Sequence, residues 1–571
     1  MNKIPKLSII ISIYNKEPLL VRCLNSIKNQ TFTDFECLMI DDGSTDNSAA
    51  ICKKYEVVDK RFRYIYKENG GLSSARNLGI ELSKGEWLGF PDPDDYCEVG
   101  MYEKLLNNTD HADIVLCEMA YYDKTRIRND KKFHIIPGHY NKDNQKVLSS
   151  GQYDIGFNAR GIFNSGLIKK SGLRYIDSFC EDSIFVTALL NQSDKGLTII
   201  PDILYNYFYY QGSLGHRIFD RTFILKSYKQ IYPFIFRSKW FEDNEMLKRR
   251  LVDHLRKVLI RKYKSIDFVV PMVNPSKESF KKDFEKYSKL EGHYDPNRDS
   301  ERYAYSDNLL KFMFRSIDKY MNWIGVMHII VRNDDDIPEW LDKSKVNVIY
   351  HSDYIPSHHL PTFNSGTIES YMPDLLLSEN FIFSNDDFIA LNNLKSTDFF
   401  DIDISINKNE KIPVYILEKT SLKFFESDET CKSFLKMLKL SLAHSKIKLL
   451  KMIGSKQYYK CRHIMCPLKL SRIKHLKLMN EKEINDSCTR FRSDKNIAYW
   501  YFAYDQAFNT PHIKKGFPYS YIGRRTDPKN ITSLLDKNKY RATCINNMNN
   551  IENDVINILG NYFSEKCSYE L

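Results

Sequence analysis

The chain has 571 residues, of which 42% are hydrophobic and 13% aromatic, so it can form more than one packed core. Its 84 basic and 73 acidic residues give a net charge of +11, which favours anionic partners such as nucleotide-sugars, phosphodiester polymers and anionic membrane surfaces. No apolar run approaches the ~20 residues of a membrane helix, and no nucleic-acid-binding motif occurs, so we expect neither a membrane span nor a nucleic-acid partner.

The apolar run near the N-terminus is short and is broken by Tyr14 and Asn15, which predicts a strand and not a signal peptide. The 12 cysteines are scattered with no CxxC pair. We therefore expect reduced thiols in a cytoplasmic protein, whose basic faces suit peripheral contact with the inner membrane or an export complex. Cys461, His463 and Cys466 lie close together, but zinc is the less favoured interpretation because a second ligand pair is lacking.

Strands and helices alternate through the N-terminal part of the chain. Residues 7–14 (LSIIISIY) and 35–40 (FECLMI) are the continuous apolar runs of strands buried on both faces. Residues 18–30 place their apolar side chains on one helical stripe. Residues 62–96 contain a third strand, a glycine loop, a helix and a fourth strand. This order predicts an α/β fold with a mainly parallel sheet, which binds ligands at the carboxyl ends of its strands.

Acidic side chains follow two of these strands. Asp41 and Asp42 come after the second, and Asp92, Asp94 and Asp95 come after the fourth. Carboxylates two residues apart on an extended segment point to one side, where they can meet a ribose or hold Mg²⁺ beside a diphosphate. The alternative is an ordinary acidic turn, because a bare DxD is a common pattern.

Four motifs in fixed order give this part of the chain a resemblance to a known family. SIYN, DDGSTD, GGLSSARNLG and DPDD, within residues 7–96, resemble a family-2 glycosyltransferase of GT-A fold, which is Rossmann-like with a mainly parallel sheet. Ser12 and Pro93 depart from the usual pattern without removing a ligand side chain. The resemblance implies Mg²⁺ or Mn²⁺ held by Asp92 and Asp94. It also implies nucleotide-sugar contacts from Tyr14, Asn15, Asp41, Asp42, Arg76 and Asp92.

Residues 161–186, which contain Glu181 and Asp182, resemble the acceptor side of the same family. By resemblance Asp182 is the general base that takes the acceptor proton, with Glu181 second, and an α-linked donor would yield a β-glycoside. The alternative is a pair of acids that interact with a helix dipole. We assign residues 1–262 to this first domain, with a helical bridge from about residue 217.

A second set of elements follows. Residues 265–275 (SIDFVVPMVNP) predict a buried strand, and residues 360–388 predict a loop, a helix capped by Asn364 or Ser365, and a strand. That strand ends directly at Asn385, Asp386 and Asp387. Two carboxylates at this position can hold a hard cation beside a phosphate, although an acidic turn explains them equally well on the residues alone.

LPTFNSGTIES and FIFSNDDF resemble the second conserved block of the Stealth family, the hexose-1-phosphate transferases of bacterial capsule synthesis. With weaker matches on both sides, the resemblance spans residues 263–571, which we assign to a second α/β domain. Asn274 stands where the family usually has Asp. His351, Asp353 and His359 rank lower as base or phosphate ligands, because a lone histidine is more often structural.

The Stealth resemblance implies a set of site residues. They are the catalytic residues His463 and Asp267, the Mg²⁺ ligands Asp386 and Asp387, and the nucleotide-sugar contacts Asn364, Ser365, Glu369, Arg302 and Arg492.

Together the two resemblances predict a bifunctional capsule polymerase that uses nucleotide-sugars, for which uridine diphosphate donors are the family habit, and extends a capsular polysaccharide acceptor. One domain would form a glycosidic bond and the other a sugar-1-phosphate diester. Two alternatives stay open. The first domain could be a non-catalytic binding module, or the whole chain could be a scaffold beside the export machinery.

Overall fold

The structure is a computed structural model, and it describes residues 4–122, 128–129, 136–141, 155–209, 218–291, 306–403, 410–413, 417–420, 458–461, 465–479, 481–491, 519–522, 526–545 and 552–571. The chain divides into two compact units, the N-terminal unit (Met1–Val258) and the C-terminal unit (Leu259–Leu571). The predicted domain boundary at residue 262 stays a prediction. Within the described residues, no helix is long and apolar enough to cross a membrane.

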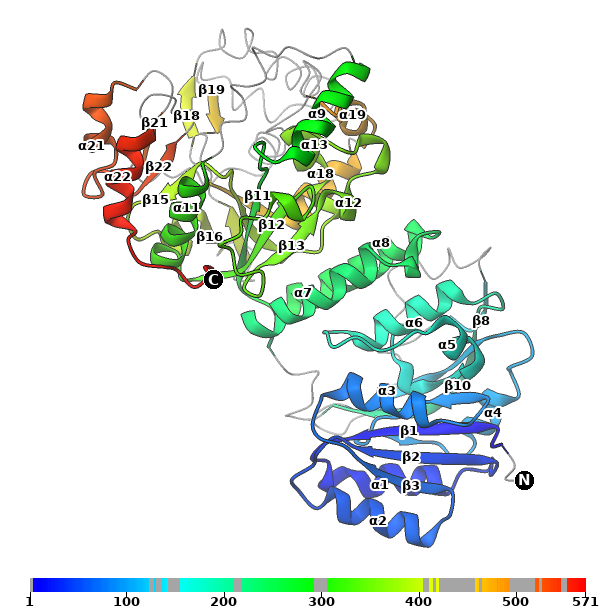
Figure 1. The fold of residues 1–571 in the computed structure, drawn as a ribbon. Coiled ribbons are helices and arrows are strands. Elements are labelled where there is room, and N and C mark those ends of the chain that lie inside the picture. Colours follow the sequence, from blue (N-terminus) through cyan, green and yellow to red (C-terminus); the bar gives the residue numbers. More distant parts are fainter. Residues whose placement is uncertain are drawn as a thin grey trace. The chain divides into compact units, whose positions relative to one another are not determined.

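The described strands of the N-terminal unit form one mixed, mainly parallel sheet (Figure 1). Along its main path the strands are β3 (Phe62–Tyr66), β2 (Phe35–Asp41), β1 (Leu7–Ile13), β4 (Trp87–Gly89), β9 (Gly161–Asn164), β6 (Ile114–Tyr122), β10 (Leu197–Phe208) and β5 (Tyr96–Cys97), with β7 (Arg128–Asn129) beside β6 and β8 (Gly138–Tyr140) beside β10. The pairs β1–β2, β2–β3, β1–β4 and β6–β10 are parallel. Strand β9 is antiparallel to both of its neighbours.

Helices cover both faces of this sheet. The described helices of this unit are α1 (Glu17–Lys28), α2 (Ser48–Val58), α3 (Leu72–Leu82), α4 (Met101–Leu106), α5 (Ser165–Ser171), α6 (Glu181–Gln192), α7 (Arg221–Phe236) and α8 (Glu245–Lys262), of which α1 and α3 lie on opposite faces of the sheet. Leu20 and Leu24 of α1 join the core formed by Ile9 and Ile11 on one face of β1. Helix α3 packs on the opposite face, because a Cβ at Gly79 would lie 2.2 Å from Ile10. The polar loops between strands and helices therefore meet at the carboxyl edge of the sheet.

The C-terminal unit contains a second, separate sheet. Its strands, in spatial order, are β13 (Asn347–Tyr350), β12 (Ile324–Val331), β11 (Ile266–Pro271), β14 (Asn380–Phe383) and β20 (Cys466–Lys469). The first four are parallel, and β20 runs antiparallel to β14. Smaller sheets join β15 (Phe388–Ala390), β22 (Ala542–Ile545) and β21 (Tyr519–Ile522), then β16 (Phe400–Asp403) and β17 (Glu410–Pro413), then β18 (Leu417–Thr420) and β19 (Tyr458–Cys461).

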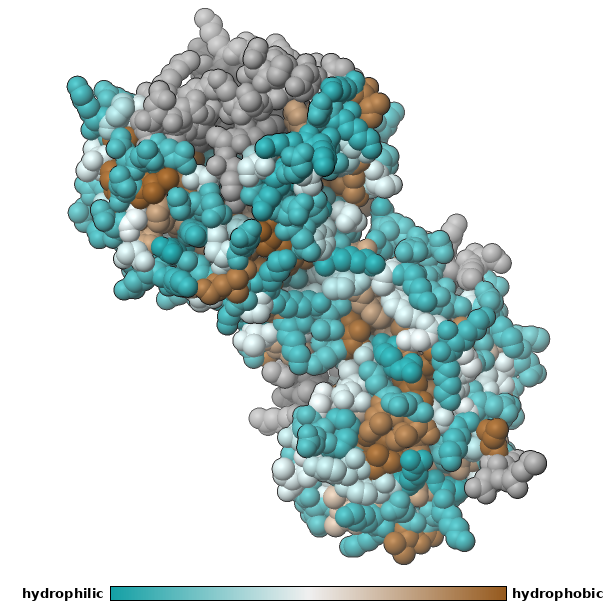
Figure 2. Space-filling view, in the orientation of Figure 1, coloured by the Kyte–Doolittle hydropathy of each residue, from teal (hydrophilic) through white to brown (hydrophobic). Residues whose placement is uncertain are grey.

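The described helices of this unit are α9 (Glu278–Glu291), α11 (Asp307–Tyr320), α12 (His351–Tyr354), α13 (Ser365–Tyr371), α14 (Ser396–Phe399), α18 (Leu470–Met479), α19 (Glu481–Ser487), α21 (Ile531–Leu534) and α22 (Glu552–Tyr562). Met313 and Ile317 of α11 pack with Phe268 and Ile329 in the main core of the unit. Hydrophilic residues dominate the visible face of each unit (Figure 2). The predicted fold class, a GT-A domain followed by a second α/β domain, is confirmed.

Candidate functional site

The loops after β1 and β2 of the N-terminal unit are bonded to each other at the carboxyl edge. Asn15 adopts a left-handed conformation with φ of 50°, and its Oδ1 accepts from the Thr45 backbone N–H at 2.8 Å. Tyr14 is 48% exposed beside it. Asp42 accepts from the backbone N–H groups of Gly70 (2.9 Å) and Gly71 (2.8 Å). Tyr14 thus presents an open ring at this edge, whereas Asn15 and Asp42 hold the loops together.

Asp41, for which the resemblance implies a nucleotide-sugar contact, is fully buried. Its Oδ2 accepts from the Tyr64 hydroxyl at 2.7 Å, and its Oδ1 accepts from the Ser44 backbone N–H at 2.8 Å. Both oxygens therefore already serve the fold. The nucleotide-sugar contact predicted for Asp41 stays a prediction.

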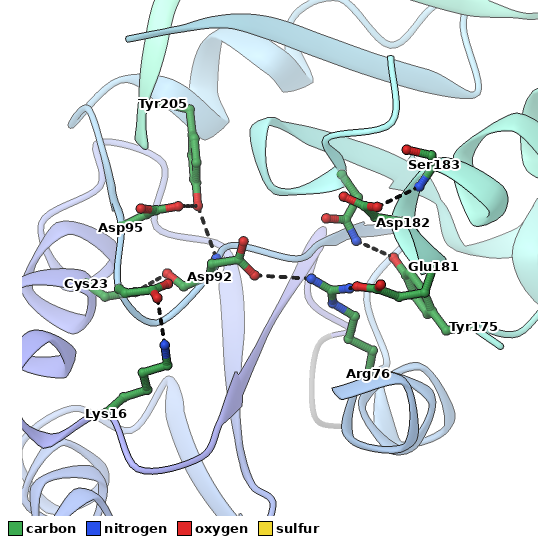
Figure 3. A network of polar contacts seen from close by, with 12 residues as sticks. Lys16, Cys23, Arg76, Asp92, Asp95, Tyr175, Glu181, Asp182, Ser183 and Tyr205 are labelled. Carbon is green, nitrogen blue, oxygen red and sulfur yellow. Dashed lines mark hydrogen bonds and ion pairs between the residues drawn. The ribbon is translucent and has the colours of Figure 1, made fainter. Parts of the chain in front are cut away.

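Asp92, Asp94 and Asp95 all follow β4. Tyr205 connects Asp92 and Asp95 (Figure 3). The Tyr205 hydroxyl donates to Asp95 Oδ2 at 2.7 Å and accepts from the Asp92 backbone N–H at 3.2 Å. Asp95 Oδ1 also accepts from the Phe208 backbone N–H at 2.8 Å. Burial, together with repulsion from Asp94 and Asp92, raises the pKa of Asp95 well above its ordinary value. Asp95 therefore positions the loop that carries the other two carboxylates.

The two carboxylates of the DxD motif each form an ion pair with a cationic side chain, Lys16 or Arg76 (Figure 3). Lys16 Nζ donates to Asp94 Oδ2 at 2.7 Å. Arg76 Nη2 donates to Asp92 Oδ1 at 3.1 Å and Arg76 Nη1 donates to Glu181 Oε1 at 2.8 Å. Sequence reasoning passed over Lys16, although it directly follows the SIYN motif. Arg76, predicted to bind nucleotide-sugar, has a side chain only 5% exposed and bridges the DxD to the acceptor-side acids.

The acids predicted to activate the acceptor begin helix α6. Glu181 and Asp182 are its first two residues and are half-buried. The residue before them, Cys180, is left-handed with φ of 57°, an uncommon conformation for a non-glycine residue that is often found near functional sites. Asp182 Oδ1 accepts from the Ser183 backbone N–H at 2.8 Å. The geometry thus permits both the catalytic role and the helix-dipole alternative.

The carboxylates after β4 fit a divalent cation. Burial, with repulsion from Asp94 and Glu181, raises the pKa of Asp92 to about 6, although Arg76 and Lys16 oppose the shift. Such a crowded set of hard oxygen donors is the environment that Mg²⁺ or Mn²⁺ stabilises. Among the residues that the structure describes, no group of three His, Cys, Asp or Glu side chains is arranged as a complete metal site. Asp92 and Asp94 could therefore supply only part of the coordination shell.

In the C-terminal unit, Asp386 and Asp387 follow β14 at the carboxyl edge of its sheet. Asp386 is exposed and Asp387 is half-buried. Cys544 Sγ donates to Asp387 Oδ2 at 3.4 Å, and burial raises the pKa of Asp387 to about 6. The Ile545 backbone N–H donates to the Asp387 carbonyl at 2.7 Å, which ties this loop to β22. Because Asp386 is exposed and Asp387 is half-buried, the two carboxylates could hold a cation whose other ligands are water molecules.

Asn364 caps α13 and connects it to a distant segment. Its Oδ1 accepts from the Gly366 backbone N–H at 3.0 Å, and its Nδ2 donates to the Thr489 carbonyl at 3.1 Å. Ser365 is half-buried as the first residue of α13, and Glu369 is 5% exposed further along it. Asn364 therefore organises the loop, and its predicted contact with a nucleotide-sugar stays a prediction.

Asp267 lies in the first half of β11 and is fully buried. Its Oδ1 accepts from the Val326 backbone N–H at 2.8 Å and from the Tyr263 hydroxyl at 2.9 Å. Its Oδ2 lies 3.1 Å from His328 Nε2. These contacts link neighbouring strands inside the sheet. The catalytic role predicted for Asp267 stays a prediction, and the geometry favours a structural one.

The structure does not describe three of the predicted site residues, which are Arg302, His463 and Arg492. The zinc alternative at Cys461, His463 and Cys466 is therefore not tested, because His463 belongs to it. Arg332 is a residue that sequence reasoning missed. It follows β12 at the carboxyl edge and donates through Nε and Nη2 to Asp336 at 2.9 and 2.8 Å. Its position after a buried strand was the available signal.

The mixed sheet of the N-terminal unit, with carboxylates after β4, has the arrangement of a GT-A fold. Residues 8–167 match the profile described as glycosyl transferase family 2, and residues 302–408 match Stealth protein CR2, conserved region 2. The chain thus joins a family-2 glycosyltransferase domain to a Stealth region.

Relatives resemble the N-terminal part of the chain. The uncharacterized glycosyltransferase EpsJ of Bacillus subtilis (strain 168) is 29% identical over 217 residues, which are 36% of this chain and 61% of EpsJ. Glycosyltransferase GlyG of Streptococcus pneumoniae serotype 4 is 29% identical over 229 residues, which are 38% of this chain and 74% of GlyG. The chain therefore spans less than two thirds of EpsJ. Among solved structures, S. aureus TarS 1–349 in complex with UDP-GlcNAc is 20% identical with a TM-score of 0.37, covering 44% of this chain and 72% of TarS.

Proposed function

We propose that the chain is a bifunctional capsular polysaccharide polymerase that forms a glycosidic bond in its N-terminal unit and a sugar-1-phosphate diester in its C-terminal unit. The observation that carries the proposal is the presence, in one chain, of family-2 glycosyltransferase and Stealth regions, each with carboxylates at the carboxyl edge of its own parallel sheet. The edge of a parallel sheet is where α/β enzymes bind nucleotides.

In the N-terminal unit, Asp182 is the proposed base. The acceptor oxygen bonds to the sugar C1, the bond from C1 to the diphosphate oxygen breaks, and the acceptor proton passes to Asp182. Asp92 and Asp94 would hold Mg²⁺ or Mn²⁺, which offsets the charge of the leaving diphosphate. Arg76 keeps Asp92 and Glu181 at fixed separation through its two hydrogen bonds. Attack opposite the diphosphate inverts the anomeric centre.

In the C-terminal unit, the acceptor oxygen would bond to the β-phosphorus of the donor. The bond between that phosphorus and the bridging oxygen breaks, and a nucleoside monophosphate leaves with the electron pair. His463 is the proposed base, Arg302 and Arg492 the proposed phosphate clamps, and Asp386 and Asp387 the proposed ligands of the cation. The C1–O bond stays intact, so the sugar keeps its donor configuration.

We propose uridine diphosphate sugars as donors and the growing capsular polysaccharide as acceptor, at the cytoplasmic face of the inner membrane. A single-activity enzyme with a non-catalytic N-terminal unit is the second candidate. One observation favours this candidate: Asp92 is already paired with Arg76, and Asp94 with Lys16. A binding module that holds no metal ion could keep these ion pairs permanently.

Nucleotide release from the purified full chain tests the proposal, with Mn²⁺, an oligosaccharide acceptor and a panel of nucleotide-sugars. Wild type should release both nucleoside diphosphate and monophosphate. D182N should lower diphosphate release by about 10²–10⁴-fold, the range for losing a general base, and D387N should lower monophosphate release.

The matched controls change exposed or half-exposed aspartates in the same units. One control is D177N, which changes an aspartate that forms an ion pair with Lys226 in the wild type. The other is D335N, which changes an exposed aspartate. Both controls should keep both activities. Release of monophosphate alone across the panel would favour the single-activity enzyme. Release of neither nucleotide would contradict both enzymatic proposals and favour a scaffold.

A further inference from the structure

Arg332 and His351 are neighbours at the carboxyl edge of the C-terminal sheet. Strands β12 and β13 are parallel, and their last paired residues are Val331 and Tyr350. Arg332 follows directly after β12, and His351, the first residue of α12, follows directly after β13. Because adjacent strands lie about 4.8 Å apart, the two side chains start from adjacent backbone positions.

The guanidinium of Arg332 is held in one orientation. Its Nε and Nη2 donate to the two oxygens of Asp336 at 2.9 and 2.8 Å, a bidentate fork. The Phe280 ring lies 4.8 Å from its Cζ, and the side chain is 4% exposed. Nη1 is buried and makes no hydrogen bond within the described part of the chain, although it forms a longer ion pair with Asp283 Oδ2 at 3.8 Å. One edge of a fixed, buried cation is thus left without a hydrogen bond to a described residue.

His351 has the same property. It is 4% exposed, and neither ring nitrogen makes a hydrogen bond to any described residue. Burial and the positive charge of Arg332 lower its pKa to about 3, so the ring is neutral and carries one N–H donor. Buried donors without acceptors are costly, and native proteins normally satisfy them with protein atoms, water or a ligand.

We propose that Arg332 Nη1 and the His351 ring form an anion subsite that receives a phosphate oxygen. Phosphate oxygens accept hydrogen bonds from a guanidinium and from an imidazole N–H, and a fixed guanidinium is well suited to phosphate. The choice of a nucleotide-sugar diphosphate as the anion rests on the proposed function of the C-terminal unit, but the subsite itself does not.

The subsite is connected to the remaining strand ends of the sheet. The Asn274 backbone N–H, in the loop after β11, donates to Asp336 Oδ1 at 3.1 Å. The carboxylate that fixes Arg332 therefore also fixes this loop. Strand β11 lies between β12 and β14, and β14 leads to Asp386 and Asp387. An anion held at Arg332 and His351 would share the edge with the proposed cation ligands.

Histidine-ring NMR on the full chain tests the subsite, with inorganic pyrophosphate as the probe. H351L identifies the His351 signals, and it should fold at least as stably as wild type, because leucine removes two unsatisfied buried nitrogens. We expect saturable shifts of the His351 ring nitrogens on addition of pyrophosphate. H475L, at an exposed position of α18, serves as the control for loss of a histidine signal. Unchanged His351 signals at saturating pyrophosphate would overturn the proposal and assign these nitrogens to buried water.

The arginine is tested by a matched pair. R332K keeps a positive charge beside Asp336 but removes Nη1, and we expect the Kd read from the His351 signals to rise at least about tenfold, the equivalent of one lost charge-assisted hydrogen bond. R315K removes the same group from a similar fork, in which Arg315 Nε and Nη2 donate to Glu570 at 2.6 and 2.8 Å. It should leave the Kd unchanged. Equal Kd values for wild type and R332K would overturn the role of Arg332.

A second titration separates this inference from the proposed function. If pyrophosphate and a nucleotide-sugar both shift the His351 signals, the subsite serves the donor. If pyrophosphate shifts them and no nucleotide-sugar of the panel does, the subsite stands while the proposed sugar-1-phosphate transfer loses its donor site.

Discussion

The two units place similar side chains at the carboxyl ends of parallel strands, but they use them differently. In the N-terminal unit, Asp92 and Asp94 are paired with the side-chain cations of Arg76 and Lys16, which a metal ion would have to displace or join. In the C-terminal unit, Asp387 after β14 accepts from the Cys544 thiol, while Asp267 and Asn364, which lie away from that edge, are bonded to backbone groups of the fold. Whether an acid or amide acts as a ligand or as scaffold is thus decided by what already occupies its oxygen and nitrogen atoms.

The largest expected effect comes from Arg76. R76M would leave the partly exposed Asp92 and Glu181, whose side chains are 31% and 18% exposed, without their shared cation, so we expect a loss below the about 3–5 kcal/mol of a fully buried ion pair. Urea unfolding should show that loss in the N-terminal unit, and diphosphate release should vanish. R315M in the C-terminal unit breaks a comparable pair with Glu570, and it should lower stability without changing the monophosphate turnover of folded protein. If folded R315M lost monophosphate turnover, Arg315 would have a functional role, and the proposed difference from Arg76 would be wrong.

Asp267 is the next test, because its contacts predict a structural role. D267N converts acceptor oxygens into an amide that cannot satisfy all of its present donors, and we expect a loss of about 2 kcal/mol in the stability of the C-terminal unit. Monophosphate turnover per folded molecule should stay unchanged. A fall in turnover at unchanged stability would instead restore the catalytic role.

Lys16 competes with a divalent cation for Asp94. K16M removes the competing ammonium group, so Mn²⁺ should bind the N-terminal unit about tenfold more tightly, a gain of about 1.4 kcal/mol. Electron paramagnetic resonance of free Mn²⁺ measures this affinity. K54M, which changes an exposed lysine on α2, is the control and should leave it unchanged. Weaker binding in K16M would mean that Lys16 supports the cation site.

Cation binding should release protons in both units near pH 6. Asp92 and Asp387 both have pKa values raised to about 6, above the about 3.9 of an unfolded chain. Protonation therefore stabilises the cation-free fold as the pH falls through 6, and only the ionised carboxylate binds the cation. Calorimetry of Mn²⁺ binding in two buffers should detect proton release at pH 6 and almost none at pH 8. D92N and D387N should each remove one contribution.

The smallest effect concerns Cys544, whose thiol donates to Asp387 and favours its ionised form. C544A should raise the pKa of Asp387, and the acid limb of monophosphate release should move up by less than about one pH unit, because a thiol is a weak donor. C567A, which changes a half-buried cysteine beside Glu570, should not move it. If C544A leaves the acid limb of the pH profile of monophosphate release unchanged, Asp387 is not the group that titrates there.

Much of the fold followed from local patterns. The apolar runs predicted at residues 7–14 and 35–40 form the parallel strands β1 (Leu7–Ile13) and β2 (Phe35–Asp41), and Asn364, one of the two predicted caps, caps α13. The gathering of Asp92, Asp94 and Asp95 after β4 was also predicted from their place after a strand. Strand order and the antiparallel insertion of β9 were not, because pairing between distant strands has no local signal.

The sequence by itself determined which chemistry-bearing residues lie at the strand ends, since burial and alternation of elements put them there. Only the tertiary structure decided which of them are already in use. Asp41 and Asp267 bond to neighbours far along the chain, whereas Arg332 and His351 meet through strand register and keep nitrogens without acceptors among the described residues. The physical reason is that hydrogen-bond satisfaction depends on distances between segments remote in sequence, which residue type and spacing do not specify.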